Sequence, residues 1–428
     1  MRKLFFALTL LLSWQPPGLF AQQTRRLDTT TFVVLGEGLA AGMANYGLNE
    51  VVQSKSFPAQ MARQMNTAFP QPLIEGPGLG DVLGYQSLPV RIPAFAQGRV
   101  RVFPERPDPD DEAPTLFVFN LSVPNLPLSE SLTRKPVSPL VHNDDPHQTA
   151  INLILGFPSM ILERDVPLWT QFEYAKAMVP SVALVELGYF EVLAAAVARD
   201  PTLIPDRASF RDSYAQIVRG LREMYVEVIV TTIPDPMDTA YFSTPASIAR
   251  LTRVPDSFIR DFYGLAPGDY VTRNGLTVIG NQFIRRNIQP LPSDVILRAN
   301  QGPEFTNRVR ALNEEINAVA RENGAVVYDL AGLFNRIRTT GFTVGSTRIT
   351  GDYFGGFYSL DGYYPGVAGH GIIANEILSL LNRTYAENFP LLDLSSIVQE
   401  DAVTKFAPAR EPDESMLEFQ RLPRWETE

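Results

Sequence analysis

The sequence predicts an α/β fold in which helices cover both faces of a parallel sheet of about five strands, a three-layer αβα sandwich. Short β-branched, apolar runs alternate along the chain with longer segments of helical periodicity. Most of these runs end at Gly, Asn or Pro, residues that terminate strands and open turns. The predicted strands are residues 31–35, 116–119, 181–187, 226–232 and 325–329.

Helices are predicted between these strands and after the last one. In the segment 305–323 apolar residues recur every three or four positions, which places them on one face of a helix. The predicted helices are residues 39–44, 192–199, 209–224, 305–323 and 367–381. Sites in parallel sheets lie at the carboxyl ends of the strands. The expected site segments are therefore 36–39, 120–125, 188–191 and the loop before the last helix.

Composition excludes several classes of function. The 428-residue chain has 37 Lys and Arg against 47 Asp and Glu, a net charge of −10, and lacks the basic patch of a nucleic-acid-binding protein. It contains no cysteine, which excludes disulfides, thiolate metal sites and a cysteine nucleophile. No run of 18 apolar residues follows the N-terminus, so no transmembrane helix is expected.

The N-terminus has the pattern of a signal peptide. Arg2 and Lys3 precede a mostly apolar run, 4–14, that is too short to span a bilayer, and Ala21 offers a small residue for cleavage. We expect residues 1–21 to be removed after Ala21 and the protein to be secreted or periplasmic. The alternative interpretation of this segment is an N-terminal membrane anchor.

The remainder divides into one domain and a tail. Residues 30–386 are expected to form the domain, and two long stretches, 71–113 and 235–302, interrupt its alternation of strands and helices. We interpret both as insertions that could roof the site. Residues 387–428 are polar with weak periodicity and are expected to be a tail that is draped on the surface or disordered.

The segment 32–47 resembles the first sequence block of the SGNH/GDSL family of esterases and lipases, in which a strand leads into Gly-Asp-Ser-Leu. The residues that match this block are Gly36, Leu39 and Gly42. Glu37 stands where the family has Asp or Asn, and Gly38 stands at the position of the nucleophilic serine.

The segment 359–369 resembles the last block of the same family, Ser-x-Asp-Gly-x-His-Pro, which opens the final helix. Ser359 and Asp361 match, but Tyr364 stands at the position of the catalytic histidine. The first and last blocks occur in the family's order, near opposite ends of the predicted domain.

The two middle blocks match less closely. In the segment 120–125, Asn125 replaces the glycine that the family uses as an oxyanion donor. In the segment 188–193, Phe190 replaces the oxyanion asparagine and Glu191 replaces the neighbouring aspartate. The resemblance implies an SGNH/flavodoxin-like fold and an ester hydrolase that uses no cofactor, yet of the family's triad only Asp361 is retained.

These replacements remove the family's chemistry. Gly38 has no nucleophile, and Tyr364, with a reference pKa of about 10, is a poor base at neutral pH. Phe190 offers no side-chain donor, whereas Asn125 keeps its backbone N–H and tolerates a positive φ. We therefore predict an exported, catalytically degenerate protein that uses the remnant cleft for binding or scaffolding, with an unidentified small-molecule, lipid or glycan ligand.

The alternative is an active hydrolase of ester or acyl-sugar substrates that uses rearranged residues. In it, Glu37 or Glu191 would activate water. The simpler interpretation is that both glutamates replace the family's acids and keep structural hydrogen bonds.

Other candidates are weaker. His370 falls inside the predicted last helix and is expected to pack or cap there, and the segment 142–147, with His142 and His147, is expected to be a solvated loop with no bound metal. The serines nearest to the family blocks are Ser87, Ser122 and Ser359. An aromatic set could line an apolar or sugar-stacking cleft or belong to the core, and the sequence leaves both open. Its members are Tyr353, Phe354, Phe357, Tyr358, Tyr363 and Tyr364.

Overall fold

The computed structural model describes residues 26–76, 78–80, 83, 117–140, 145–157 and 167–401. The predicted signal peptide lies outside the described residues, as do Ser87, His142 and most of the predicted insertion 71–113.

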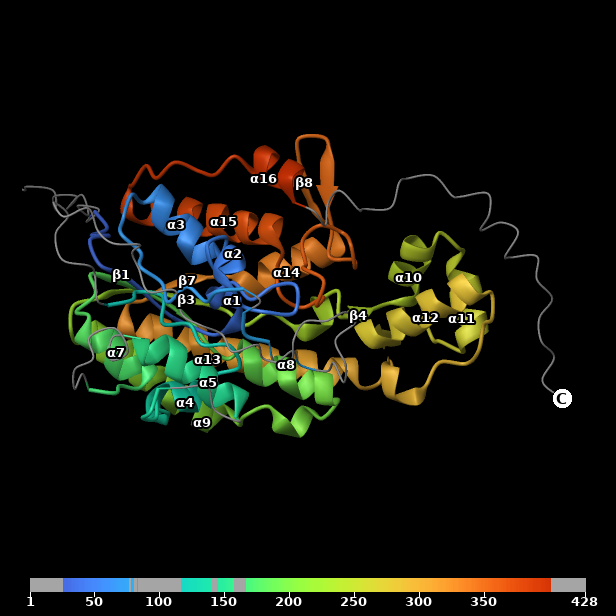
Figure 1. Cartoon of the computed structure of the whole chain (residues 1–428), viewed down its shortest axis with the longest axis horizontal. Coiled ribbons are helices and arrows are strands. Elements are labelled where there is room, and N and C mark those ends of the chain that lie inside the picture. The colour runs from blue at the N-terminus through green and yellow to red at the C-terminus, as the bar shows by residue number, and fades with distance from the viewer. Residues whose placement is uncertain are drawn as a thin grey trace, which may run out of the picture.

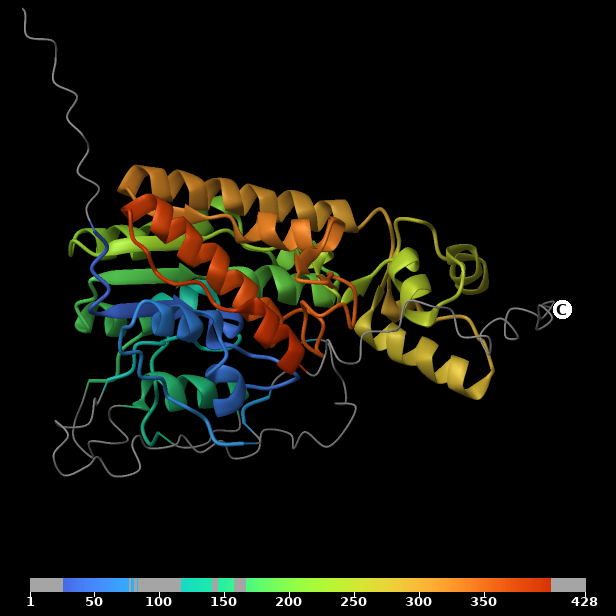
Figure 2. The same ribbon diagram turned by 90° about the horizontal axis from the view of Figure 1, so that it is seen from above.

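A four-stranded parallel sheet forms the centre of the fold, in the order β1-β2-β3-β7 (Figures 1 and 2). Its strands are β1 (Phe32–Gly36), β2 (Val182–Glu186), β3 (Glu227–Thr231) and β7 (Val326–Tyr328). Every residue of β1 and β2 is buried, which is why these strands are near-continuous apolar runs. The predicted α/β fold with a parallel sheet is confirmed.

The predicted strand 116–119 is not assigned as a strand. Three backbone hydrogen bonds of 2.8–3.2 Å instead join the free edge of β1 to residues 119–123, with one parallel bridge between Val34 and Asn120. The pairing therefore begins where the apolar run ends. The N–H of Phe119 donates to the carbonyl of Pro70 (2.8 Å), so this segment is held on its other side as well.

Helices lie on both faces of the sheet (Figure 1). On one face lie α2 (Glu50–Gln53), α3 (Phe57–Gln64), α14 (Leu330–Thr339) and α15 (Val367–Tyr385). On the other face lie α4 (Leu128–Thr133), α5 (Pro146–Leu155), α7 (Gln171–Ala177), α8 (Tyr189–Ala198), α9 (Arg207–Arg222) and α13 (Gly302–Asn323). The short α1 (Gly38–Ala41) follows β1 directly. Helices α3 and α15 pack together, as do α9 and α13.

Local sequence explains where these helices begin and end. The Asp206 carboxylate accepts the N–H groups of Ala208 and Ser209 and so caps α9. Helix α13 ends at Gly324, whose φ of 65° is the left-handed conformation that glycine adopts at low cost. The apolar residues of α9 and α13 recur with the helical period and therefore form one stripe on each helix. Each stripe is buried against the sheet side of the domain.

The predicted insertion 235–302 forms most of a small lobe that extends from one end of the domain (Figures 1 and 2). Three short antiparallel strands, in the order β4-β5-β6, carry three helices. Its elements are β4 (Phe242–Ser243), α10 (Pro245–Thr252), α11 (Asp256–Tyr263), β5 (Tyr270–Thr272), α12 (Arg273–Arg285) and β6 (Ile296–Leu297). The structure also contains a β-hairpin and three 3₁₀ turns. The hairpin strands are β8 (Phe342–Val344) and β9 (Thr347–Ile349), and the turns are η1 (Pro201–Leu203), η2 (Pro236–Asp238) and η3 (Ser293–Val295).

The first part of the predicted tail contains a helix that the sequence did not indicate. Helix α16 (Leu394–Glu400) packs on α15. The side chains of Asn375 and Asn382 each exchange two hydrogen bonds of 2.8–3.0 Å with the backbone of the intervening segment, and Asp401 Oδ2 accepts the Ala368 N–H (3.0 Å). Contacts to α15 thus hold residues 387–401, and residues 402–428 lie outside the described part of the chain.

Within the part of the chain that the structure describes, no helix combines the length and apolar character needed to cross a bilayer.

Asp401 supplies the cap that α15 lacks in its own sequence, since Gly366 precedes the helix and has no side chain. We expect Asp401→Ala to lower the free energy of unfolding by about 1 kcal/mol, because the Ala368 N–H loses a charged acceptor at a helix N-terminus. Urea unfolding checks this. The control is Glu400→Ala, which removes an exposed carboxylate next in sequence; equal effects of the two changes would contradict the assignment.

Candidate functional site

The Tyr364 ring lies directly against the backbone of Gly38. A Cβ atom on Gly38 would lie 2.6 Å from Tyr364 Cζ and still closer to its hydroxyl oxygen. Both residues are buried, and Tyr364 is 1% exposed. The two positions that the sequence resemblance assigns to a nucleophile and a base are therefore in contact, and any side chain at Gly38 is excluded while Tyr364 keeps this rotamer.

Asp361 holds the turn that carries Tyr364. Its Oδ1 accepts the N–H groups of Tyr363 (3.1 Å) and Tyr364 (2.9 Å), and its Oδ2 accepts the hydroxyl of Ser359 (2.6 Å). Burial raises the pKa of Asp361, and the hydrogen bonds from Ser359 and the two backbone N–H groups oppose that rise. A backbone N–H of Tyr46 also bonds to this carboxyl, so the acid of the predicted triad is committed to Ser359 and to backbone from two distant segments.

The aromatic set belongs to the core. Of its six members only Phe354 is not fully buried. Tyr364 packs edge-to-face on Tyr189 and Tyr363, with ring centroids 6.2 and 4.9 Å apart, and Tyr363 contacts Tyr241 of the segment that leads into the lobe. The Tyr189 hydroxyl donates to the carbonyl of Tyr363 (2.9 Å). These rings fill the space before the last helix.

Glu37 joins the first block to the start of α8. Its Oε1 accepts the Tyr189 N–H (2.7 Å) and the carboxylate also receives the Phe190 N–H, so it satisfies the first donors of that helix. The side chain is 0% exposed, and its Oε2 has no hydrogen-bond partner among the described residues. Phe190 thus donates its backbone N–H to Glu37, the residue next to Gly38, and its ring has no hydrogen-bond donor.

Two further glutamates accompany Glu37, and sequence reasoning missed Glu186. Glu186 ends β2, is 2% exposed, and its Oε2 accepts the N–H groups of Glu37 (3.3 Å) and Ala40 (3.1 Å). Glu191 is half-buried, but its Oε2 is enclosed and its Oε1 accepts the Leu128 N–H (2.6 Å). A charged residue in an otherwise apolar strand was the signal that could have identified Glu186.

Burial is the main cause of the perturbed ionisation of these acids. It raises the pKa of Glu186 to about 8 and that of Glu191 to about 7, against the backbone hydrogen bonds that favour the charged form. Burial also raises the pKa of Glu37 well above its usual value, and the charges of Glu186 and Glu191 add to the rise. The Glu186 carboxyl is therefore expected to be mostly protonated at neutral pH.

Asn125 adopts the left-handed conformation, with φ 60°, which asparagine tolerates better than most residues do. It is buried in the loop between the segment paired with β1 and α4, where Glu191 holds the N–H of Leu128. The five positions that the resemblance assigns to a site therefore lie on loops and helix starts at the carboxyl ends of β1 and β2 and before α15. Contacts join Gly38, Asp361 and Tyr364. Glu37 directly precedes Gly38 and bonds the Phe190 N–H, which links Phe190 to this group.

The weaker candidates have structural roles. His370 Nδ1 accepts the Phe57 N–H (3.3 Å) at the start of α3, and burial lowers the pKa of His370 to about 3, which confirms that it packs and caps. Ser359 is bonded to Asp361, and Ser122 Oγ is buried without a partner among the described residues. His147 Nε2 pairs with Glu130 (2.7 Å).

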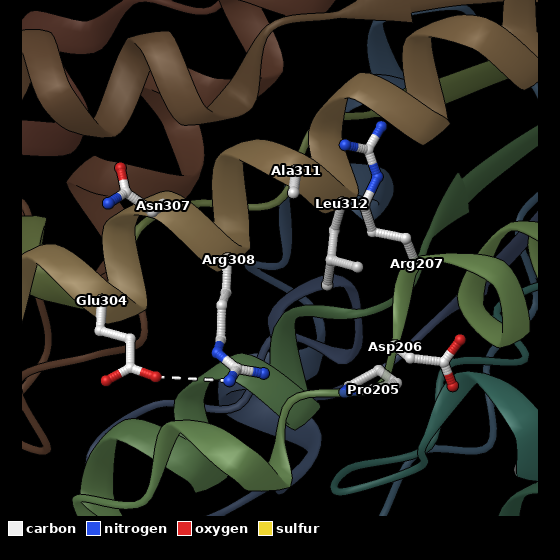
Figure 3. A pocket seen from close by; sticks show the side chains of 8 residues that line it. All are labelled: Pro205, Asp206, Arg207, Glu304, Asn307, Arg308, Ala311 and Leu312. Carbon is white, nitrogen blue, oxygen red and sulfur yellow. Dashed lines mark hydrogen bonds and ion pairs between the residues drawn. The ribbon is translucent and has the colours of Figure 1, made fainter.

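No group of three or more metal-ligating side chains in the described ranges could hold a metal ion. A surface hollow of about 450 Å³ lies between the start of α9 and the first turns of α13 (Figure 3). Its walls are Pro205, Asp206, Arg207, Glu304, Asn307, Arg308, Ala311 and Leu312. None of the predicted site residues contributes to it, and its Arg308 pairs with Glu304 (3.3 Å).

Comparison with known proteins finds no matching family model, no matching curated protein and no matching solved structure.

The contact between Gly38 and Tyr364 predicts a strong coupling between the two positions. Gly38→Ala alone is expected to cost about 1–3 kcal/mol through overpacking. In a Tyr364→Ala background the new methyl enters vacated space, so the same change is expected to cost little. Urea unfolding of the four proteins measures the difference.

A matched control is Gly220→Ala, which meets the Phe172 ring at 2.6 Å in another part of the fold. Its cost is expected to be the same with and without Tyr364. Equal costs of Gly38→Ala in both backgrounds would show that the two positions do not touch.

The raised pKa of Glu186 predicts that stability falls as pH rises. An unfolded glutamate ionises near pH 4.5, whereas the folded one ionises at about pH 8. The contribution of protonated Glu186 is therefore complete below pH 4.5 and is lost progressively up to pH 8. Glu186→Gln, which keeps an acceptor and cannot ionise, is expected to be more stable than the wild type at pH 8 and to flatten this dependence.

Thermal unfolding between pH 4.5 and 9 checks the prediction, with the exposed Glu400→Gln as the control. Parallel pH profiles for the wild type and Glu186→Gln would contradict it.

Proposed function

We propose that this chain is an exported, catalytically degenerate protein of the SGNH/GDSL type that acts by binding or scaffolding. The observation that carries the proposal is the occupation of the space at Gly38 by the Tyr364 ring. In a working member of that family a serine side chain would need this space.

The order of the sheet supports the SGNH/flavodoxin-like part of the proposal. With the edge segment 119–123 counted as a fifth strand, the chain order across the sheet is second, first, third, fourth, fifth. This is the doubly wound order whose ligand sites lie beside the first strand, at the carboxyl ends. Helices on both faces fit a three-layer sandwich (Figure 1).

Acyl transfer needs a nucleophile, a base near pH 7 and donors aimed at the oxyanion. Gly38 supplies no nucleophile, and Tyr364 is poorly suited to accept a proton at neutral pH. Asp361 bonds to Ser359 and to backbone rather than to an imidazole. Removal of the nucleophile alone costs about 10⁶ in turnover in a serine protease, so these losses together support a non-catalytic role.

Burial also bears on the remnant cleft. Tyr364, Asp361 and Glu37 are at most 1% exposed, so a ligand at Gly38 would have to displace the tyrosine ring. We therefore propose that binding uses the outer surface of the domain or its lobe, and that the former reaction centre now stabilises the fold.

One observation favours the alternative of an active hydrolase. Glu191 is half-buried with a pKa of about 7, the range that general acid–base catalysis requires. However, its hydrogen bond is to the Leu128 N–H, and among the described residues no hydroxyl bonds to it.

The purified mature protein is expected to give no turnover of short or long acyl p-nitrophenyl esters or acetylated sugars, and no labelling by a fluorophosphonate, because Gly38 has no hydroxyl and the Tyr364 ring occupies the space beside it. Steady-state assays and in-gel fluorescence measure this. An active serine esterase of the same family serves as the positive control.

Hydrolysis that is present in the wild type and abolished in Glu191→Gln or Glu37→Gln would establish the alternative. Exposed Glu400→Gln is the matched control for the change of charge.

A further inference from the structure

The lobe presents a cationic amphipathic helix. Lobe residues 235–302 contain seven arginines and six aspartates, with no lysine or glutamate, in a chain whose net charge is −10. No acidic residue occurs between Asp269 and Asp294, a stretch that includes α12 and three arginines. Helix α12 buries Gly275, Leu276 and Ile279 and leaves its last turn exposed.

The exposed end of α12 combines an apolar side chain with two positive charges. Ile284 is 83% exposed, more than any other aliphatic side chain among the described residues, and Arg285 and Arg286 beside it are exposed. The preceding Phe283 is half-buried and contacts Phe258 of α11, with ring centroids 6.3 Å apart. The contact between Phe283 and Phe258 therefore packs the last turn of α12 on α11.

Among the described residues, no acidic side chain pairs with the charges at this end of α12. Four other lobe arginines have partners: Arg250 with Asp352, Arg260 with Asp256, Arg298 with Asp269, and Arg273 over the ring of Tyr353. Arg285 and Arg286 form no ion pair with any described residue. Both remain available to an anionic partner.

We propose that the tip of the lobe, defined as Phe283, Ile284, Arg285 and Arg286, docks on the surface of an anionic lipid bilayer. A bilayer surface offers phosphate groups to the two arginines and acyl chains to Ile284 at one boundary, while the rest of the apolar face of α12 stays packed inside the lobe. A second copy is a poorer occupant, because a symmetric contact would bring two cationic tips together. This inference rests on the lobe and goes beyond the proposed function.

Flotation of the full mature chain with vesicles tests the proposal. Binding is expected to phosphatidylcholine vesicles that contain 30% phosphatidylglycerol, to be much weaker with phosphatidylcholine alone, and to fall as salt is raised. Arg285→Gln with Arg286→Gln is expected to weaken binding about 30-fold, since each basic residue near the surface contributes about fivefold. Ile284→Ser is expected to weaken it about tenfold.

Matched controls change the same residue types elsewhere. Arg219→Gln with Arg321→Gln alters net charge equally on α9 and α13, and Val51→Ser removes another exposed aliphatic side chain. Both controls are expected to bind as the wild type does.

Three results would overturn the proposal. The first is no binding of the wild type to anionic vesicles at low salt, and the second is equal weakening by the tip variants and the controls. The third is sedimentation showing a wild-type dimer that the tip variants dissociate without any change in vesicle binding, which would assign the tip to self-association.

Discussion

The contact between the Tyr364 ring and the backbone of Gly38 is the constraint on which the arrangement at the carboxyl edge of the sheet depends. It joins the loop after the first strand to the turn before the last long helix, two segments more than 300 residues apart in sequence. Asp361 fixes that turn from within by accepting backbone N–H groups. The ring on one side leaves no room for a side chain on the other, so a change at Gly38 depends on the residue at position 364.

Two buried glutamates, Glu37 and Glu186, and the half-buried Glu191 lie near this contact and order the backbone. Each accepts at least one backbone N–H group: Glu37 at the start of α8, Glu186 from the β1–α1 connection and Glu191 from the loop before α4. The low polarity that raises their pKa values also strengthens these hydrogen bonds. Such carboxyls stabilise loops at the edge of the sheet, and their ionisation is a cost that the fold carries at high pH.

The lobe attaches to the domain through the same turn that carries Tyr364. The Tyr241 N–H donates to the carbonyl of Gly362 (2.8 Å), and Arg250 bonds Asp352 across the same boundary. The base of the insertion therefore packs on the turn before α15, while α12 extends away from the sheet (Figure 2). The residues around Gly38 are thus buried, whereas Ile284, Arg285 and Arg286 at the end of α12 are exposed.

The sequence predicted the elements that local physics controls. The β-branched runs gave β1, β2, β3 and β7, and the helical periodicity gave α9, α13 and α15, because burial on two faces or on one stripe leaves a pattern in the chain. The tolerance of Asn125 for a positive φ and the packing of His370 followed from residue type in the same way.

Only the tertiary structure showed which side chains from distant segments contact one another. Helix α16 depends on hydrogen bonds from Asn375 and Asn382 of α15, and the aromatic set became core because Tyr189 and Tyr241 approach it from distant segments. Glu186 joined the site because β1 and β2 pair side by side. A sequence shows which residue is missing from a site, but only the folded chain shows which side chain fills its space, since that depends on contacts between segments with no local signal.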